Sequence, residues 1–242
     1  MAQPTAARAS ALRVESHGPL NVLERLAQPA KVTSWPCATL DGKRCAAGAL
    51  SPIMVFVGDQ EELHASPAER LVLRMPEQAD LERLFGLYSD PRVWGPDPLT
   101  RHEDPAQTER MIGRWRTAWD RDGLGMWTAW DGDEFVGIGG CFVRYGLAWN
   151  LGFRLRPPCW GRGYAQEISV AAIFAARRRR AELPVTAYLL EGNDRSLRAV
   201  ERTGLSRVWR GPDAGNPDAA AIRLLYSDQP LPPTVLRALT EH

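Results

Sequence analysis

The segment "RPPCWGRGYAQE", residues 156–167, contains the residues whose types and spacing most directly suggest chemistry. Gly161 and Gly163 flank Arg162, between two prolines and a run of helix-forming residues. Such a turn leaves the first amides of the following helix without intrahelical partners, beside the positive end of the helix dipole. Because glycine has no Cβ, a bulky diphosphate can lie against this backbone. The segment therefore predicts a site for a phosphate ester.

Two nucleotide-binding loops are excluded by their own requirements. A Walker loop needs Gly-Lys-Ser or Gly-Lys-Thr after its second glycine, and none occurs here. A dinucleotide fingerprint needs a third glycine, where this chain has Gln166, and a parallel strand–helix–strand start. A structural alternative is that the glycines only make a tight strand-to-helix turn. Two glycines alone favour that alternative, so the wider sequence pattern must decide.

The elements that must position this loop follow from hydrophobic periodicity. Their order predicts an α/β domain with a mixed sheet, rather than a doubly wound one. Asp104 and Pro105 mark the start of one helix, and Gly204 is the predicted C-terminal cap of another. The predicted elements are a strand at 70–75, helices at 76–90 and 104–120, strands at 126–130, 134–144 and 148–156, a helix at 163–180, a strand at 185–190, a helix at 193–204, and strands at 206–210 and 221–227.

Composition and periodicity also divide the chain. Residues 1–65 are rich in Ala, Pro, Ser and Gly and lack a sustained period, so they are predicted to be a poorly ordered N-terminal extension. The patterned domain is expected at 66–229, followed by a C-terminal tail at 230–242. The net charge of +1 and the lack of a long apolar run predict neither a nucleic-acid nor a membrane partner. With no secretory signal pattern, a cytoplasmic location is expected.

Scattered cysteines and histidines predict no metal site. The four cysteines match no metal-ligand spacing, and the four histidines do not cluster along the sequence. Three histidines fall in predicted tails, and His102 falls in a predicted polar loop. Cys159 is interpreted as a packing residue rather than an acyl carrier.

The wider pattern resembles the GNAT acetyltransferase superfamily, and within it the branch of ribosomal-protein N-terminal acetyltransferases (RimJ/RimL type). The resemblance covers about residues 66–228. It implies a mixed, mostly antiparallel central sheet with flanking helices and a splayed strand pair. Arg162 replaces the branch's usual lysine, and Leu205 replaces a frequent phenylalanine. The matching residues are Trp160, Gly161, Gly163, Tyr164, Ala165 and Glu167, then Asn193, Ser196 and Gly204.

The resemblance implies acetyl-CoA as co-substrate and assigns roles to residues. The amides of 161–165 would hold the CoA pyrophosphate, and the strand before them would pair with the pantetheine arm. Asn193 would contact pantetheine or only cap a helix, and Ser196 would protonate the departing thiolate or only cap locally. Glu167 is favoured as a structural residue at the helix start. The implied cofactor-binding set is Phe153, Arg154, Leu155, Trp160, Gly161, Arg162, Gly163, Tyr164, Ala165, Asn193 and Ser196.

The implied reaction is attack of a neutral primary amine, from a protein N-terminus or a small molecule, on the thioester carbonyl. A thioester is already activated, so positioning matters most and a carboxylate acting through water can accept the proton. The candidate carboxylates are Asp97 and either Asp213 or Asp218, because all lie in loops expected near the acceptor, and Ser196 is the candidate acid. The resemblance is compatible with a homodimer. The alternative function is a non-catalytic acyl-CoA-binding module.

Overall fold

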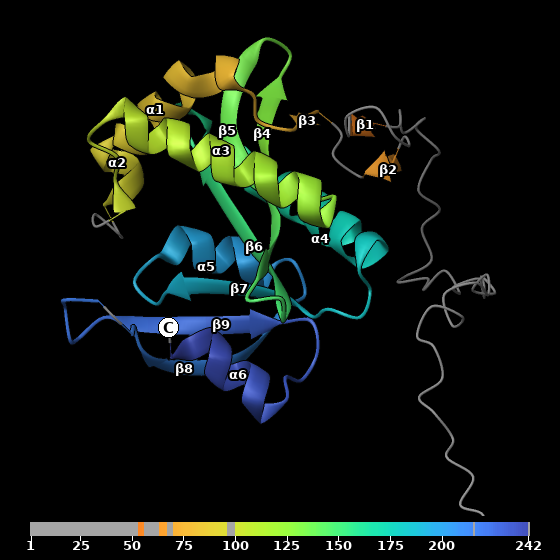
Figure 1. Cartoon of the computed structure of the whole chain (residues 1–242). Coiled ribbons are helices and arrows are strands. Elements are labelled where there is room, and N and C mark those ends of the chain that lie inside the picture. The colour runs from red at the N-terminus through yellow and green to blue at the C-terminus, as the bar shows by residue number, and fades with distance from the viewer. Residues whose placement is uncertain (1–52, 56–62, 67–69, 96–99, 215, 242) are drawn as a thin grey trace, which may run out of the picture. The chain divides into compact units, whose positions relative to one another are not determined.

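The computed structural model describes residues 53–55, 63–66, 70–95, 100–214 and 216–241. A seven-stranded sheet with the order β3-β4-β5-β6-β7-β9-β8 forms the centre of the domain (Figure 1). Every neighbouring pair is antiparallel except β6 and β7, which confirms the predicted mixed, mostly antiparallel sheet. The strands are β3 (Val72–Arg74), β4 (Met126–Asp131), β5 (Glu134–Arg144), β6 (Ala148–Leu155), β7 (Val185–Leu190), β8 (Ser206–Pro212) and β9 (Ile222–Ser227).

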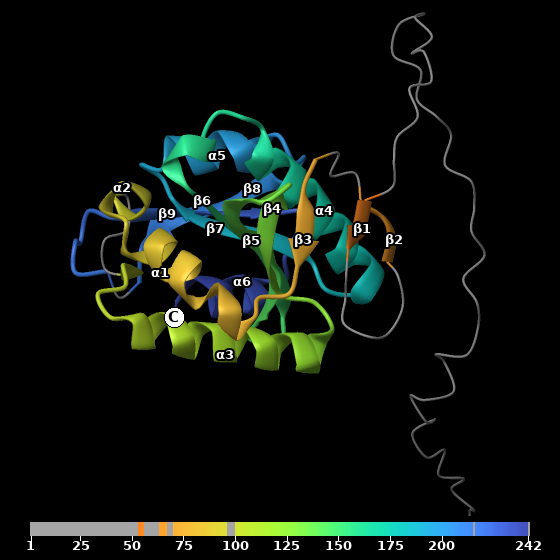
Figure 2. The ribbon, with the colours of Figure 1, turned by 90° about the horizontal axis from the view of Figure 1, so that it is seen from above.

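Helices cover both faces of this sheet. Helices α1, α3 and α6 lie on one face, and α4 and α5 lie on the other (Figure 2). None of the helices in the described part of the chain combines the length and apolarity needed to cross a membrane. The helices are α1 (Leu81–Ser89), α2 (Pro91–Trp94), α3 (Pro105–Asp122), α4 (Tyr164–Arg179), α5 (Asp194–Glu201) and α6 (Pro233–Thr240), with short 3₁₀ turns at Gln78–Asp80 and Pro157–Cys159.

Each helical layer buries its own apolar cluster against the sheet. On one side, Met111 and Ile112 of α3 pack with Ile138 of β5. On the other side, Ile168 of α4 packs in a cluster with Leu151 of β6. Because side chains alternate along a strand, β6 supplies odd-numbered residues to the α4 side and leaves even-numbered ones for the α3 side. One face of β6 therefore contacts the α4 layer, and the other face is directed toward the α3 layer.

The sheet opens where β6 and β7 separate. They pair only at Trp149–Val185, Asn150–Thr186 and Leu151–Ala187, so residues 152–155 of β6 have no partner on β7. Helix α5 begins just after β7, and the turn into α4 begins just after β6. The splayed strand pair expected from the resemblance is therefore present, and it faces the starts of two helices.

Three local features differ from the sequence prediction. The helix predicted at 76–90 ends at Ser89, because Asp90 precedes a proline and is extended (φ −70°, ψ 114°), and α2 follows as a separate turn. Helix α5 ends at Glu201, with Arg202 as C-cap, and Gly204 (φ +82°) lies in the following turn.

Three further elements lie in segments for which no element was predicted. Helix α6 falls within 230–242 and buries Leu239. Strands β1 (Ile53–Val55) and β2 (Leu63–Ser66) pair with each other near the end of the segment assigned to the extension.

Candidate functional site

The glycine loop joins β6 to α4 through two left-handed residues. Gly161 has φ +75° and Gly163 has φ +86°, a region that side-chain-bearing residues rarely adopt. Gly163 is the N-cap of α4 and, having no side chain, leaves the helix start uncapped. A Cβ on Gly161 would meet no protein atom within 4 Å. At Gly161 the loop backbone is therefore open on the side where the Cβ atom is missing, whereas a Cβ on Gly163 would lie 3.5 Å from the Arg70 guanidinium.

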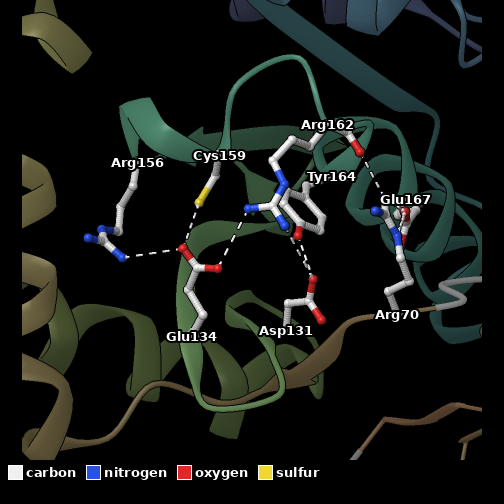
Figure 3. A network of polar contacts seen from close by, with 8 residues as sticks. All are labelled: Arg70, Asp131, Glu134, Arg156, Cys159, Arg162, Tyr164 and Glu167. Carbon is white, nitrogen blue, oxygen red and sulfur yellow. Dashed lines mark hydrogen bonds and ion pairs between the residues drawn. The ribbon is translucent and has the colours of Figure 1, made fainter.

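The amides of this loop are available to a ligand. In the described part of the chain, the N–H groups of residues 161–165 donate to no protein atom. Arg70 donates to the carbonyl oxygen of Arg162 at 2.8 Å and also bonds Glu167 (Figure 3). Because a trans peptide directs its C=O and N–H oppositely, the Gly163 amide points away from Arg70. Free amides at a helix start with a positive dipole form an anion site.

The side chain of Arg162 turns toward the β4–β5 hairpin instead of the amides (Figure 3). Its guanidinium lies 3.6 Å from Glu134 and 4.0 Å from Asp131, and its Cζ lies 4.9 Å from the centre of the Tyr164 ring. The Tyr164 hydroxyl donates to Asp131 at 2.5 Å, a bond that raises the pKa of the tyrosine. Arg162 is a sequence-predicted site residue that the structure orients toward these carboxylates.

A cavity of about 360 Å³ lies along the loop. Its walls come from the end of β6, the glycine loop, the first turn of α4 and the first turns of α5. The indole N–H of Trp160 donates to the carbonyl of Leu155 at 2.9 Å, which fixes the loop to the strand end. The cavity is lined by all the predicted cofactor-binding residues except Arg162: Phe153, Arg154, Leu155, Trp160, Gly161, Gly163, Tyr164, Ala165, Asn193 and Ser196.

A second cavity, of about 690 Å³, lies on the α3 side of the sheet. It is lined by residues from α3, the loop before it, and the separated ends of β6 and β7. Trp94 ends α2 as a buried residue and lines this cavity. Four residues line both cavities: Phe153, Arg154, Asn193 and Ser196. The two cavities therefore adjoin at the splay between β6 and β7.

Asn193 and Ser196 lie at this junction and interact with each other. The side-chain oxygen of Asn193 accepts from the Ser196 amide at 3.2 Å, so Asn193 caps α5. Capping occupies only that oxygen, and the Asn193 side-chain NH₂ group remains a donor. Both of the roles considered for Asn193 are therefore compatible with its position.

Neither Asp213 nor Asp218, the candidate carboxylates that the structure describes, lines either cavity. Asp213 bonds Arg223 at 2.8 Å and Asn216 at 2.8 Å. Burial opposes its ionisation, but these two bonds outweigh burial and hold the pKa of Asp213 below its usual value. Asp97 lies outside the described residues. Cys159 is fully buried, and burial raises the pKa of its thiol, which agrees with a packing role.

Sequence reasoning missed a histidine in the larger cavity. His102 lines it, with its ring stacked on Tyr88 at 4.5 Å and its Nδ1 atom 2.8 Å from Thr108 Oγ1. Burial, with Arg114 and Arg110 nearby, lowers the pKa of His102, so the ring is neutral near pH 7. Burial raises the pKa of Tyr88 to about 12. The sequence signal available was weak: one histidine before a helix start.

In the residues that the structure describes, no group of three or more His, Cys, Asp or Glu side chains could hold a metal ion.

Comparison with known proteins identifies the family. Residues 70–206 match the Acetyltransferase (GNAT) domain family, and the chain belongs to it. The domain is thus that of an acetyl-CoA-dependent acetyltransferase. The chain is 29% identical to the uncharacterized protein YkkB of Bacillus subtilis over 161 residues, 60% of this chain and 90% of that protein.

Solved structures share the fold. A GNAT-family acetyltransferase from Bacillus anthracis superposes with a TM-score of 0.56 at 21% identity, covering 66% of this chain and 95% of its own. A Salmonella typhimurium acetyltransferase that modifies the N-terminal serine of ribosomal protein L7/L12 superposes with a TM-score of 0.57 at 15% identity, covering 67% and 96%. Identities this low establish the fold, and the acceptor amine needs a separate argument.

Proposed function

We propose that the protein transfers the acetyl group of acetyl-CoA to a primary amine by direct attack on the thioester. The observation that carries this proposal is the meeting of two cavities at the splay between β6 and β7. The smaller one offers free amides to a diphosphate, and the larger one has room for an acceptor. A thioester at the junction would lie between the two, where a positioned amine can attack it.

The loop and strand would share the work of holding acetyl-CoA. The amides of 161–165 would bind the diphosphate. The edge of 152–155 that β7 leaves free would bind the pantetheine amides as a neighbouring strand would. Ser196 would protonate the departing thiolate, because it lines both cavities at their junction. The sequence motif supports membership of the ribosomal-protein N-terminal branch, with a protein N-terminus or a small amine as acceptor.

The amine must lose a proton as the amide forms. Among the described residues that line the larger cavity, His102 is the side chain that is neutral near pH 7 and able to accept a proton there. The arginines stay protonated, and the tyrosines are neutral acids at this pH. We therefore propose His102 as the general base in place of Asp213, which lines neither cavity.

The His102→Gln variant is expected to lower kcat roughly tenfold, with KM for acetyl-CoA unchanged. The loss falls below the usual range for general bases because a thioester is activated and water can also accept the proton. The sign of the pH effect follows from the lowered pKa: His102 stays neutral to a lower pH than an ordinary histidine, and kcat falls once the pH drops below that pKa. This acidic limb of the kcat profile should disappear in the variant. An unchanged profile would remove His102 from the mechanism.

Asn193 variants separate capping from ligand contact. Asn193→Ala should cost about 1 kcal/mol of folding free energy through loss of the cap and should also raise KM for acetyl-CoA. Asn193→Asp keeps the capping oxygen but removes the NH₂ donor, so it should unfold at the wild-type temperature while KM still rises. Thermal unfolding and initial rates provide the two readouts. Wild-type kinetics in Asn193→Asp would leave only the capping role.

The proposed function is tested by mixing the protein with acetyl-CoA and a panel of amines. Free thiol should appear only when an amine is present, in step with acetylated amine measured by mass spectrometry. CoA binding with no thiol release for any amine would instead support the alternative, a non-catalytic acyl-CoA-binding module.

A further inference from the structure

The charged side chains that line the larger cavity, among the described residues, are all positive. Five arginines contribute to its lining: Arg101, Arg110, Arg114, Arg154 and Arg223. Among the described residues that line it, none is an aspartate or a glutamate. A cavity lined by one sign of charge concentrates ligands of the opposite sign. This composition is specific to the cavity, because the chain as a whole has a net charge of only +1.

Two of these arginines have carboxylate partners within the protein. Arg223 bonds Asp213 at 2.8 Å, and Arg101 lies 3.7 Å from Glu103. Arg154 stacks on Trp94, its Cζ 3.5 Å from the ring centre. Arg110 and Arg114 differ, because neither forms an ion pair with any described residue. They are four residues apart on α3, so both project from the same side of the helix. Both are exposed to solvent and line the cavity, and we call this solvent-facing end of the cavity its mouth.

Two residues in the lining, Asn150 and Tyr188, have buried polar atoms without a hydrogen-bond partner, and we call this buried part of the cavity its floor. Asn150 is 9% exposed, and its side-chain oxygen is buried without a hydrogen-bond partner. The Tyr188 hydroxyl, also in the lining, is likewise buried without a partner. An unpaired buried polar atom is costly unless a ligand satisfies it. Asn150 lies on β6 two residues before the unpaired stretch begins, so its oxygen could accept an N–H from an amine approaching the thioester.

Resting on the proposed acetyl transfer, we infer that the acceptor is an amine that also carries a carboxylate or phosphate group. Its amine lies at the floor near Asn150 and Tyr188, and its anionic group lies at the mouth between Arg110 and Arg114. Guanidinium groups bind both kinds of anion through paired hydrogen bonds. A polyamine is disfavoured, because it would bring further positive charge to a cavity whose described lining residues include arginines and no carboxylate.

Binding is the first test, because it does not depend on turnover. Calorimetry on the CoA-loaded protein would compare ω-amino carboxylates of increasing chain length with their amides, and ω-aminoalkyl phosphates with the matching alcohols. At the best length the anionic member should bind about tenfold more tightly, a modest ratio because the two arginines are exposed to solvent. The preference should shrink as salt is added. The two series show whether carboxylate or phosphate is preferred.

Variants show whether the inferred arginines cause the preference. The double variant Arg110→Gln/Arg114→Gln should reduce it to less than about threefold, while CoA and the neutral amines bind as in wild type. Arg237→Gln, on the exposed side of α6, removes one arginine charge outside the cavity lining and should keep the preference. Tighter binding of neutral amines or spermidine, or a preference that survives in the double variant, would overturn the inference.

Turnover with the same amines separates the two proposals. Anionic amines that bind preferentially but are never acetylated would overturn the proposed transferase function and leave the binding inference standing. Acetylation of neutral and anionic amines with equal kcat/KM would overturn the inference of an anionic acceptor and leave the proposed transferase function standing.

Discussion

Replacing Gly163 with valine is expected to weaken CoA binding by about a hundredfold or more. Gly163 has φ +86°, which a β-branched residue strongly resists, so the loop must change its backbone conformation. That change redirects the amides that form the anion site at the start of α4. Charge-assisted hydrogen bonds are worth roughly 1.5–3 kcal/mol each, so losing two accounts for the predicted ratio. Calorimetry with CoA measures it.

Gly146→Val is the matched control for backbone strain. Gly146 has φ +72°, a Cβ there would meet no protein atom within 4 Å, and it lines neither cavity. This control should lose stability to a similar degree in thermal unfolding but should bind CoA as the wild type does. Arg162→Ala should also bind nearly normally, because its guanidinium faces Asp131 and Glu134. A folded Gly163→Val protein with wild-type affinity would show that the diphosphate binds elsewhere.

Gly137→Ala should be the most destabilising of these substitutions, by about 3 kcal/mol or more. A Cβ at Gly137 would lie 2.2 Å from the carbonyl oxygen of Arg154 and 2.8 Å from the Cα atom of Leu155. Both atoms belong to the backbone of β6, which cannot rotate away as a side chain can, so the strand itself must shift. The loss corresponds to a fall in Tm of about 6–12 °C for a domain of this size.

The shift should also reach the cofactor strand. Because Arg154 and Leu155 lie in the stretch proposed to bind pantetheine, the Gly137→Ala variant that remains folded should have a raised KM for acetyl-CoA. Gly192→Ala is the control, since a Cβ there meets nothing within 4 Å and no positive φ is involved. Its Tm and KM should match those of the wild type. Equal Tm values for the two variants would contradict the close approach of the β6 backbone to Gly137 of β5.

Local sequence signals predicted the parts of the fold that depend on local physics. Asp104 caps α3 as predicted, accepting from the Ala106 amide at 2.8 Å. The strand-to-helix turn at Gly161 and Gly163 has the positive φ values that such a turn demands. The 18 residues of α3 present a clear apolar face, whereas α6 offers only eight residues after two prolines. So short a stripe is a weak signal, and α6 was not predicted.

The features missed at the site all depend on contacts between distant segments. Arg162 turns to Asp131 and Glu134, which lie about thirty residues earlier on a hairpin that only the fold brings close. The larger cavity forms where α3, β6 and β7 approach one another, so no local pattern marks Arg110 or Arg114 as lining residues. His102 likewise is half-buried through contacts that only the fold brings about, such as the stacking of Tyr88 of α1 on its ring. Periodicity carries no information on these pairings.

Hydrogen–deuterium exchange most directly tests the central claim, that the loop amides hold the CoA diphosphate. CoA should slow exchange of the amides in 161–165, while pantetheine, which lacks the diphosphate, should not slow them even at saturation. Helix α6 lies on the face of the sheet opposite to α4 (Figure 2) and serves as the internal reference. The exchange of its amides should be unchanged by either ligand. If CoA binds by calorimetry but leaves exchange at 161–165 as fast as in the free protein, the account is contradicted.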